Sequence, residues 1–322
     1  MLDADVVTAF DINSVANTCY EHNFPSLTVT RVNIEHLPKE FYEKKDWNAW
    51  LMSPPCQPFT RGGKLLDDED TRSTGFLYLT KVLEEMKNPP KYLFIENVLN
   101  FEVSKCHERF VSVISKRGFK IHEFLVTPND DHIGIPNDRL RYYLIAVKIS
   151  DEPIVYTENI HRSFSSFFDS NPEFASIRPE KLNESPTISQ FIRESELNSK
   201  YAVPLKYLTD YIDYRHDIVK PSTRRSTTFT KAYGSKHIIG TGSFLQTLQL
   251  DLEYSPDDRV VLPTLGLRFF SPHEIALLHD FPIETGEFSF PASVNDSQKY
   301  RLLGNSMNIR VVSLIFKILM NQ

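Results

Sequence analysis

One cysteine in this 322-residue chain stands where a nucleophile could be held rigidly. Residues 49–52 predict the end of a strand, and Ser53-Pro54-Pro55-Cys56-Gln57 follows directly. Two prolines stop a strand abruptly, which would present Cys56 at the carboxyl edge of a sheet. A lone cysteine is more often a small buried apolar residue, but prolines at a strand end favour the reactive alternative. The pattern therefore predicts a thiol nucleophile at position 56.

An acid and two arginines could complete a reaction centre around this thiol. Residues 92–95 are a continuous apolar run, typical of a buried central strand, and Glu96 follows them. Cys56 and Glu96 are one strand-helix-strand step apart, so neighbouring strands would bring both to the same sheet edge. Arg139 and Arg141 stand where a strand begins, and their i, i+2 spacing would project both to one face, where they would favour a thiolate. A pair of surface arginines is the alternative.

The first half of the chain has the alternation of elements needed to position these residues. Strands are predicted at 5–10, 27–32, 47–52, 92–95, 121–126 and 142–147, and helices at 13–22, 75–86 and 110–116. This alternation predicts an α/β fold with a doubly wound, mostly parallel sheet. In such folds ligands bind at the carboxyl ends of the strands.

The second half of the chain predicts a separate region. Residues 151–291 show no strand-helix repeat and are rich in Ser, Asn, Phe and Pro. Asn305-Ser306 is an N-cap signal, and an apolar stripe after it predicts a terminal helix. We therefore expect residues 1–150 and 292–322 to form the sheet domain, with 151–291 as a smaller inserted domain.

Charge is distributed unevenly along the chain. The net charge of −6 excludes a protein coated in basic surface, but the window 214–240 contains six basic residues and one acid, a local charge of +5. A confined basic surface predicts that one face holds a polyanion, and a solvated loop is the alternative. The basic residues are Arg215, Lys220, Arg224, Arg225, Lys231 and Lys236, and Phe229, Tyr233 and Phe244 are expected to add aromatic surfaces to this region.

Cysteine usage and the N-terminus bear on the compartment. Cys19, Cys56 and Cys106 are odd in number and contain no C-x-x-C pair, so neither a disulfide framework nor a zinc site is predicted. An acidic N-terminus and the lack of an apolar run of ~20 residues predict a soluble, unexported protein. We expect the cytoplasm or the nucleus, and a monomer.

The chain resembles the cytosine-C5 methyltransferases, which use S-adenosylmethionine, in the order of four motifs spread over nearly its whole length. These motifs are Pro54-Pro55-Cys56-Gln57, Glu96-Asn97-Val98, Arg139-x-Arg141 and Gly304-Asn305-Ser306. Residues 51–60, 134–142 and 228–234 are similar to the DNA methyltransferase-2 branch. In that branch the implied substrate is aspartate tRNA, at the anticodon-loop cytosine 38.

The resemblance implies a role for each matching residue. Cys56 would add to C6 of cytosine, Glu96 would hold N3 and the exocyclic amine, and Arg139 and Arg141 would lower the thiol pKa and grip the base carbonyl. The implied cofactor residues are Asp11, Ile12, Ile34, Glu35, Asn305 and Ser306, and the implied nucleic-acid contacts are Arg224, Arg225, Lys231 and Tyr233. From the residues alone, Asp11 could instead cap the helix that follows it.

Two features depart from the family. Thr228-Phe229-Thr230 stands where branch members carry Cys-Phe-Thr, and no glycine precedes Gly62, so the family's Phe-x-Gly-x-Gly loop is absent. We expect ~20 to 30 further residues before Met1 in the working protein, the length of one strand-loop-helix unit. The alternatives are a DNA cytosine-C5 methyltransferase, with the same core residues, and a non-catalytic nucleic-acid-binding protein.

Overall fold

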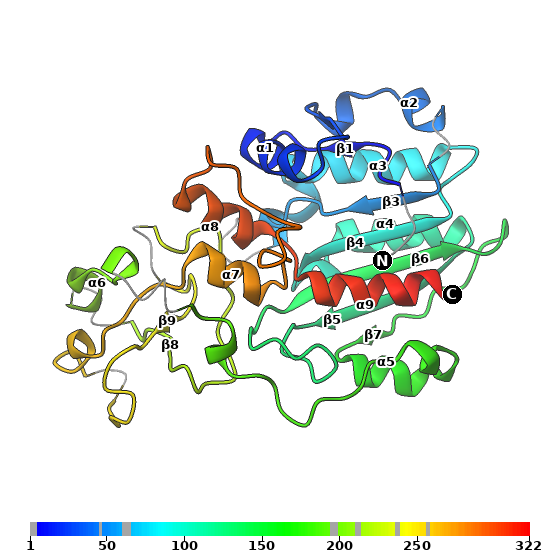
Figure 1. Cartoon of the computed structure of the whole chain (residues 1–322). Helices are drawn as coiled ribbons and strands as arrows, with labels where there is room; N and C mark the ends of the chain where they lie inside the picture. Colours follow the sequence, from blue (N-terminus) through cyan, green and yellow to red (C-terminus); the bar gives the residue numbers. More distant parts are fainter. Residues whose placement is uncertain are drawn as a thin grey trace. The chain divides into compact units, whose positions relative to one another are not determined.

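The structure, a computed structural model, describes residues 5–44, 47–59, 66–193, 199–209, 214–235, 239–255 and 258–322. The chain forms two compact units. Figure 1 shows the whole chain, with colours that follow the sequence from blue at the N-terminus to red at the C-terminus. Unit 1 comprises residues 1–126, 140–178 and 314–322, and unit 2 comprises 127–139 and 179–313. These limits differ from the expected ones at 127–139, 151–178 and 292–313, and the assignment of 151–291 to target recognition stays a prediction.

Unit 1 is built on a five-stranded sheet in the order β3-β4-β6-β5-β7. The strands are β3 (Ala49–Met52), β4 (Tyr92–Val98), β5 (Phe119–Val126), β6 (Arg141–Lys148) and β7 (Ile160–His161). β3 is parallel to β4, whereas β6 is antiparallel to both β4 and β5. The α/β fold is confirmed, but the sheet is mixed rather than mostly parallel. No crossover helix lies between β5 and β6, so the chain returns in the opposite direction.

The first two strands form a small sheet of their own. β1 (Ala9–Phe10) and β2 (Val29–Thr30) are parallel to each other and are linked by α1 (Ser14–Asn23). Both strands are shorter than the predicted 5–10 and 27–32, because only two residue pairs are in register. The predicted helix at 13–22 is confirmed within one residue at each end.

Helices cover both faces of the large sheet within unit 1 (Figure 1). α3 (Thr74–Glu85) and α4 (Lys105–Lys116) pack on the face that carries Leu93 and Ile95, and both side chains are fully buried. On the other face, the ring of Phe94 lies 4.9 Å from that of Phe316 in α9 (Ile309–Met320). Burial on both faces explains why β4 is a continuous apolar run rather than an alternating one.

Unit 2 contains little regular structure. Its elements are α6 (Leu205–Thr209), β8 (Ile218–Val219), β9 (Phe244–Leu245), α7 (Pro272–Leu278), α8 (Asp296–Asn305) and the start of α9; unit 1 also contains α2 (Lys39–Glu43) and α5 (Phe164–Ser170). A buried ion pair supports the irregular segments, with Arg268 Nη2 2.7 Å from Glu274 Oε1. Ser271 and Glu274 also form a capping box that begins α7.

The chain's last helix begins later than predicted. Asn305 ends α8 and Ser306 is its C-cap, so these residues do not cap the terminal helix. Asn308 does, because its Oδ1 accepts a hydrogen bond from the Val311 amide at 3.1 Å. The stretch Asp296–Met320 is long and apolar enough to cross a membrane, but α9 buries Leu314 and Ile318 as a core helix does.

A buried histidine on β5 should make unit 1 sensitive to acid. His122 packs against the rings of Phe167 and Phe174, and burial, helped by Lys120, lowers its pKa from 6.5 to about 4. The unfolded chain takes up this proton at higher pH, so the stabilisation is complete above about pH 6.5 and is lost as the pH falls toward 4. We expect this residue to lower the free energy of unfolding by about 2 kcal/mol between pH 7 and pH 5.

Urea denaturation of the wild type and His122→Leu at both pH values checks this expectation. The variant should lose less stability on acidification than the wild type. An identical loss in both proteins would assign the acid sensitivity to other groups, such as His161, whose pKa is also lowered by burial.

Candidate active site

The loop that carries Cys56 follows β3 and is held at both ends. Asn97 Nδ2 donates to the Pro54 carbonyl at 3.3 Å, and the Phe59 amide donates to the Cys56 carbonyl at 3.0 Å. The Phe59 ring is buried against Phe101, with 5.0 Å between the ring centroids. None of these contacts uses the thiol, and the Cys56 side chain is partly accessible. The loop thus holds Cys56 on the stiff support that the prolines predict, and the structure adds that its side chain is partly accessible.

Glu96 lies on the strand next to the Cys56 loop. β3 and β4 are parallel neighbours with Met52 paired to Ile95, so both residues occupy the carboxyl-end region of adjacent strands, as the sequence predicts. β4 continues to Val98, three residues further than predicted, because β6 pairs with it that far. Glu96 is therefore inside the strand. Its Oε1 lies 3.6 Å from Arg141 Nε, and both side chains are largely buried.

Unit 1 holds a further cation that the sequence analysis did not single out. Arg72 binds the buried Asp70 carboxylate with two bonds, Nε to Oδ1 at 2.8 Å and Nη2 to Oδ2 at 2.6 Å. The hydrogen bond to Asp70 raises the pKa of Arg72, and the charge of Cys56 contributes in the same direction. Asp70 thus fixes the Arg72 guanidinium within electrostatic range of Cys56. The only signal in the sequence was an Asp-x-Arg shortly after the cysteine loop.

The other two thiols differ from Cys56 in their surroundings. Cys19 and Cys106 are buried. Burial raises the pKa of Cys19, and burial together with a hydrogen bond to Asp67 raises that of Cys106 to about 12. Both are therefore held as neutral thiols, which leaves Cys56 as the cysteine suited to nucleophilic attack.

Arg139 belongs to unit 2 and has a different environment from the one expected. It precedes β6, which begins at Arg141, so the two arginines are not on one strand. Its guanidinium is 2% exposed and donates to three carbonyls: Nη1 to Phe229 at 3.0 Å, and Nη2 to Gly304 at 2.9 Å and Ser306 at 2.5 Å. These carbonyls belong to two separate motifs, so Arg139 holds residues 228–234 against 304–306.

Gly304 makes this approach possible. A β-carbon at this position would lie 2.1 Å from the Lys231 amide nitrogen and 2.3 Å from the Thr230 carbonyl carbon. Such contacts are with backbone and cannot relax by a side-chain rotation. The glycine of the Gly304-Asn305-Ser306 motif is therefore required for packing within unit 2.

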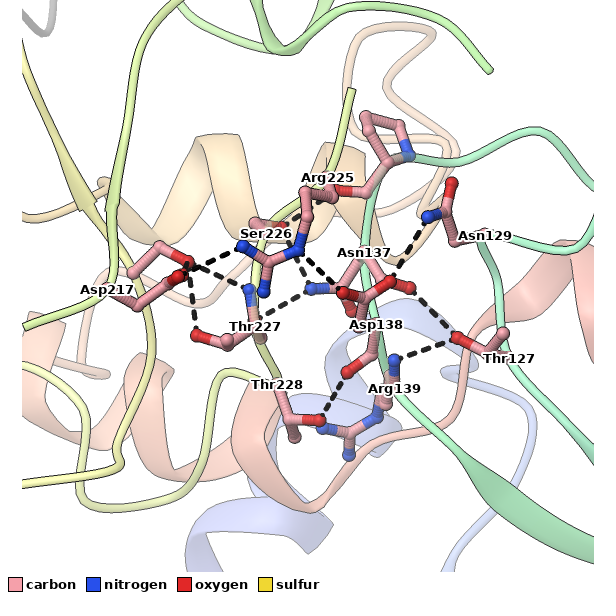
Figure 2. Close-up of polar contacts among 12 residues, drawn as sticks. Thr127, Asn129, Asn137, Asp138, Arg139, Asp217, Arg225, Ser226, Thr227 and Thr228 are labelled. Carbon is pink, nitrogen blue, oxygen red and sulfur yellow. Dashed lines mark hydrogen bonds and ion pairs between the residues drawn. The ribbon is translucent and has the colours of Figure 1, made fainter. Parts of the chain in front are cut away.

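Asn137 fastens the segment before Arg139 to the 226–230 strand-like stretch, as Figure 2 shows. The side chain is fully buried, and Nδ2 donates to Ser226 Oγ at 3.1 Å and to the Thr227 carbonyl at 3.0 Å. Ser226 Oγ in turn donates to the Pro136 carbonyl at 2.8 Å. Residues far apart in sequence are thus joined directly beside Arg139.

Asp138 continues the same network with its charge (Figure 2). Its Oδ2 accepts from Arg225 Nε at 2.9 Å, its Oδ1 from Asn129 Nδ2 at 3.1 Å, and its carbonyl from Thr228 Oγ1 at 2.6 Å. Arg225 also pairs with Asp217 Oδ1 at 3.0 Å. Arg225 is thereby tied to two carboxylates.

The basic window predicted to hold a polyanion is partly neutralised in the structure. Arg225 pairs with Asp138 and Asp217, and Arg224 Nη2 lies 2.7 Å from Glu184 Oε2. Two of these three acids lie outside the window and were not counted in its charge. Lys231 is exposed, whereas Lys236 lies outside the described residues.

The aromatic surfaces expected in this region are core residues instead. Phe229, Tyr233 and Phe244 are each at most 2% exposed. The Tyr233 hydroxyl donates to the Ser243 carbonyl at 2.7 Å and accepts from the Phe270 amide at 2.8 Å. The expected base stacking on Tyr233 does not fit this placement. Unit 2 has few strands and buries these rings to form its core.

The predicted cofactor residues of unit 1 lie after two adjacent parallel strands. Asp11 and Ile12 follow β1 and are exposed, and Ile34 and Glu35 follow β2 and are half-buried. Asn13 is the N-cap of α1, and Asp11 Oδ1 accepts from the Asn13 amide at 2.7 Å. The residue that caps this helix is therefore Asn13 rather than Asp11. The exposed carboxylate of Asp11 beside the exposed Ile12 fits a ribose and an adenine.

The comparisons with known proteins extend over the full chain. A family model for C-5 cytosine-specific DNA methylase matches residues 2–321. A Mus musculus tRNA (cytosine(38)-C(5))-methyltransferase is 37% identical over 375 residues, covering 99% of this chain and 88% of the mouse protein. A Dictyostelium discoideum DNA (cytosine-5)-methyltransferase is 34% identical, covering 99% and 89%. The crystal structure of S. pombe Dnmt2 methyltransferase matches with a TM-score of 0.79 and 32% identity, covering 98% and 90%.

The chain therefore belongs to the C-5 cytosine-specific DNA methylase family. Within that family its likeness extends over the whole chain to members of the Dnmt2 branch. The resemblance inferred from the four motifs is confirmed.

Proposed function

We propose that this protein transfers a methyl group from S-adenosylmethionine to C5 of cytosine 38 in a tRNA, with aspartate tRNA as the expected substrate. The observation that carries the chemistry is the position of Cys56 and Glu96 at the same end of the parallel neighbours β3 and β4. The choice of tRNA is supported by full-length likeness to relatives named for that reaction, in animals and in a yeast.

Cys56 is the proposed nucleophile. Its thiolate forms a bond to C6 of the cytosine, and the C5–C6 electron pair moves to C5, which becomes nucleophilic. When bound, S-adenosylmethionine supplies the electrophilic methyl group that C5 receives. Removal of the C5 proton then returns an electron pair to the C5–C6 bond and expels Cys56 as a thiolate. One difficult substitution is thereby divided into steps with lower barriers.

Glu96 and Arg141 are proposed to hold the base while this happens. Glu96 would contact N3 and the exocyclic amine, where charge develops as the thiolate adds. Arg141, 3.6 Å from Glu96, would keep that carboxylate in place and contact the base carbonyl. The Arg139 guanidinium already binds three carbonyls, so we assign it to positioning the 228–234 and 304–306 segments.

Cofactor contacts are proposed for six residues, and RNA contacts for a separate region of the chain. Asp11, Ile12, Ile34 and Glu35 of unit 1 would hold the ribose and adenine, and Asn305 and Ser306 would approach the methionine end. We infer a Rossmann-like methyltransferase domain formed by residues 1–150 and 292–322, and a target-recognition role for the inserted residues 151–291. The exposed Lys231 is the proposed phosphate contact.

The test uses the full chain with S-adenosylmethionine carrying a labelled methyl group. Three substrates are compared: a tRNA transcript, the same transcript with uracil at position 38, and duplex DNA. Label in the first substrate alone supports the proposal. DNA methylation without tRNA methylation would overturn it in favour of the second candidate, which the Dictyostelium relative's name supports.

Substituting Lys231 should weaken RNA binding through one lost phosphate contact. We expect Lys231→Ala to reduce the dependence of log K on log salt by about 0.7 to 0.9. Arg224→Ala is the matched control, since Glu184 already pairs with Arg224. Fluorescence anisotropy over a salt series measures both slopes, and equal slopes for Lys231→Ala and the wild type would place the RNA contact elsewhere.

A further inference from the structure

Unit 2 contains a pocket. Its lining includes none of the residues proposed above for catalysis or cofactor binding. Its volume is about 650 Å³, and it lies between the Lys200 region, the start of α7, the 283–290 segment and the first turn of α8. The walls are of two kinds: the rings of Tyr201, Phe288 and Phe290, and a charged edge made by Lys200, Asp296 and Lys299.

The aromatic wall is continuous. The ring centroids of Phe288 and Phe290 are 5.1 Å apart in an edge-to-face arrangement at 83°, and the Phe281 ring is tilted against Phe288 with centroids 4.6 Å apart. Phe288 and Phe290 are only partly buried, unlike the rings of the unit 2 core. Partly open rings in a hollow are suited to stacking with a flat ligand such as a nucleobase.

The charged edge lies directly beside these rings. Lys299 Nζ lies 5.6 Å from the Phe290 centroid, and Lys200 Nζ lies 5.1 Å from that of Tyr201. Asp296 is between the two lysines, with Oδ2 2.6 Å from Lys200 Nζ and Oδ1 3.5 Å from Lys299 Nζ. Two cations and one carboxylate leave an excess of one positive charge, which suits a single phosphate group.

A histidine also belongs to the wall of the pocket. His273 lines the pocket, and its buried Nε2 has no hydrogen-bond partner within the described part of the chain. The accessible wall is therefore mainly aromatic and charged, and a flat ligand would cover the phenylalanines.

We propose that this pocket binds one unstacked nucleotide of the RNA substrate, other than the target cytosine. The base stacks on the Phe290 ring, the Phe288 ring at 83° to it contacts the base at its edge, and the phosphate contacts Lys200 and Lys299. Asp296 accepts a hydrogen bond from an exocyclic amine, the contact by which carboxylates read cytosine. The inference rests on the proposed function in that the ligand is part of an RNA substrate.

α8 connects the pocket to the proposed cofactor residues of unit 2. Asp296 begins this helix and Asn305 ends it, so nine residues of helical rise separate them by roughly 13 Å. A nucleotide in the pocket would therefore help to fix which nucleotides of a single-stranded RNA lie along unit 2.

The test measures binding of the full chain to a fluorescein-labelled single-stranded hexaribonucleotide and to the same sequence as a duplex. We expect tighter binding of the single strand, and Phe290→Ala should weaken that binding by about 5-fold to 100-fold, the range for loss of one stacked base. Phe290→Trp should restore it. Lys200→Ala should reduce the salt slope by about 0.7.

Lys206→Ala is the matched control. Lys206 is exposed and lies over the Tyr207 ring at 5.1 Å, the same kind of contact as that of Lys200 over Tyr201, but it does not line the pocket. The proposal is overturned if the single strand does not bind, or if Phe290→Ala and Lys200→Ala bind it as Lys206→Ala does. Because the Lys200 side chain is largely exposed, Lys200→Ala should fold, and it tests the proposal even if Phe290→Ala does not fold.

The two proposals can fail separately. Methyl transfer to tRNA by the wild type tests the proposed function without reference to the pocket. If methyl transfer is normal and both pocket variants bind RNA as the wild type does, the proposal for the pocket is wrong and the proposed methyltransferase function stands. If RNA binding depends on the pocket but no methyl group is transferred, the proposed function is wrong and the pocket proposal stands.

Discussion

Replacing Cys56 with alanine should reduce methyl transfer by at least about 10⁴-fold, because the route through a covalent bond to C6 is then closed. RNA binding should remain close to that of the wild type. The carbonyls of the Cys56 loop accept hydrogen bonds from the Asn97 side-chain amide and the Phe59 backbone amide, neither of which involves the thiol. The loop should therefore keep its conformation in the variant.

Single-turnover methyl transfer and anisotropy measure the two effects. Cys19→Ala is the matched control: it removes a thiol of the same unit that is buried and held neutral, and should keep full activity. A tRNA with 5-fluorocytosine at position 38 adds a direct readout, because C5 has no proton to lose and the bond to Cys56 persists. Wild-type activity in Cys56→Ala, or a trapped complex with it, would remove covalent catalysis by Cys56 from the mechanism.

Arg139→Ala should have the largest effect on stability, with loss of activity as a consequence. Three carbonyls lose a charged donor, and hydrogen bonds to charged groups contribute about 1.5 to 3 kcal/mol each, so unfolding should become easier by at least about 4 kcal/mol. The carbonyls of Phe229, Gly304 and Ser306 would then be released from one another. Urea denaturation and kcat measure the two effects together.

Arg141→Ala is the comparison for this prediction. Arg141 lies beside Glu96 and donates only to its neighbouring Leu140 carbonyl among the bonds described, so its loss should lower kcat while stability changes far less. Arg139→Lys should be intermediate, since one ammonium cannot reach three carbonyls with the guanidinium's geometry. An inactive Arg139→Ala with wild-type stability would show that this guanidinium acts on the substrate instead.

The residues of unit 1 that carry the proposed chemistry could be located from the sequence. The signals were local ones: prolines after a strand, an acid after an apolar run, and one strand-helix-strand step between them. Such signals depend on neighbouring residues, so they can be recognised without the tertiary structure. β6 was different. Its strand character was clear, but its direction depended on whether a helix intervened after β5, and the expected parallel arrangement was wrong.

The partners of charged and aromatic side chains in unit 2 could not be located in this way. Arg225 is paired with an aspartate 87 residues away, and the three carbonyls that bind Arg139 are 90, 165 and 167 residues away. A charge count over 214–240 cannot include such partners. Tyr233 was expected at the surface, but an irregular unit with few strands needs its aromatic rings for its core.

The sequence by itself determined the family, the α/β class and the strand-end positions of Cys56 and Glu96, because motif order and hydrophobic pattern are properties of neighbouring residues. Only the tertiary structure decided which arginine stands beside Glu96, which one binds the carbonyls, and where unit 2 opens a pocket. The physical reason is that hydrogen bonds, ion pairs and burial depend on groups that folding brings together from distant parts of the chain.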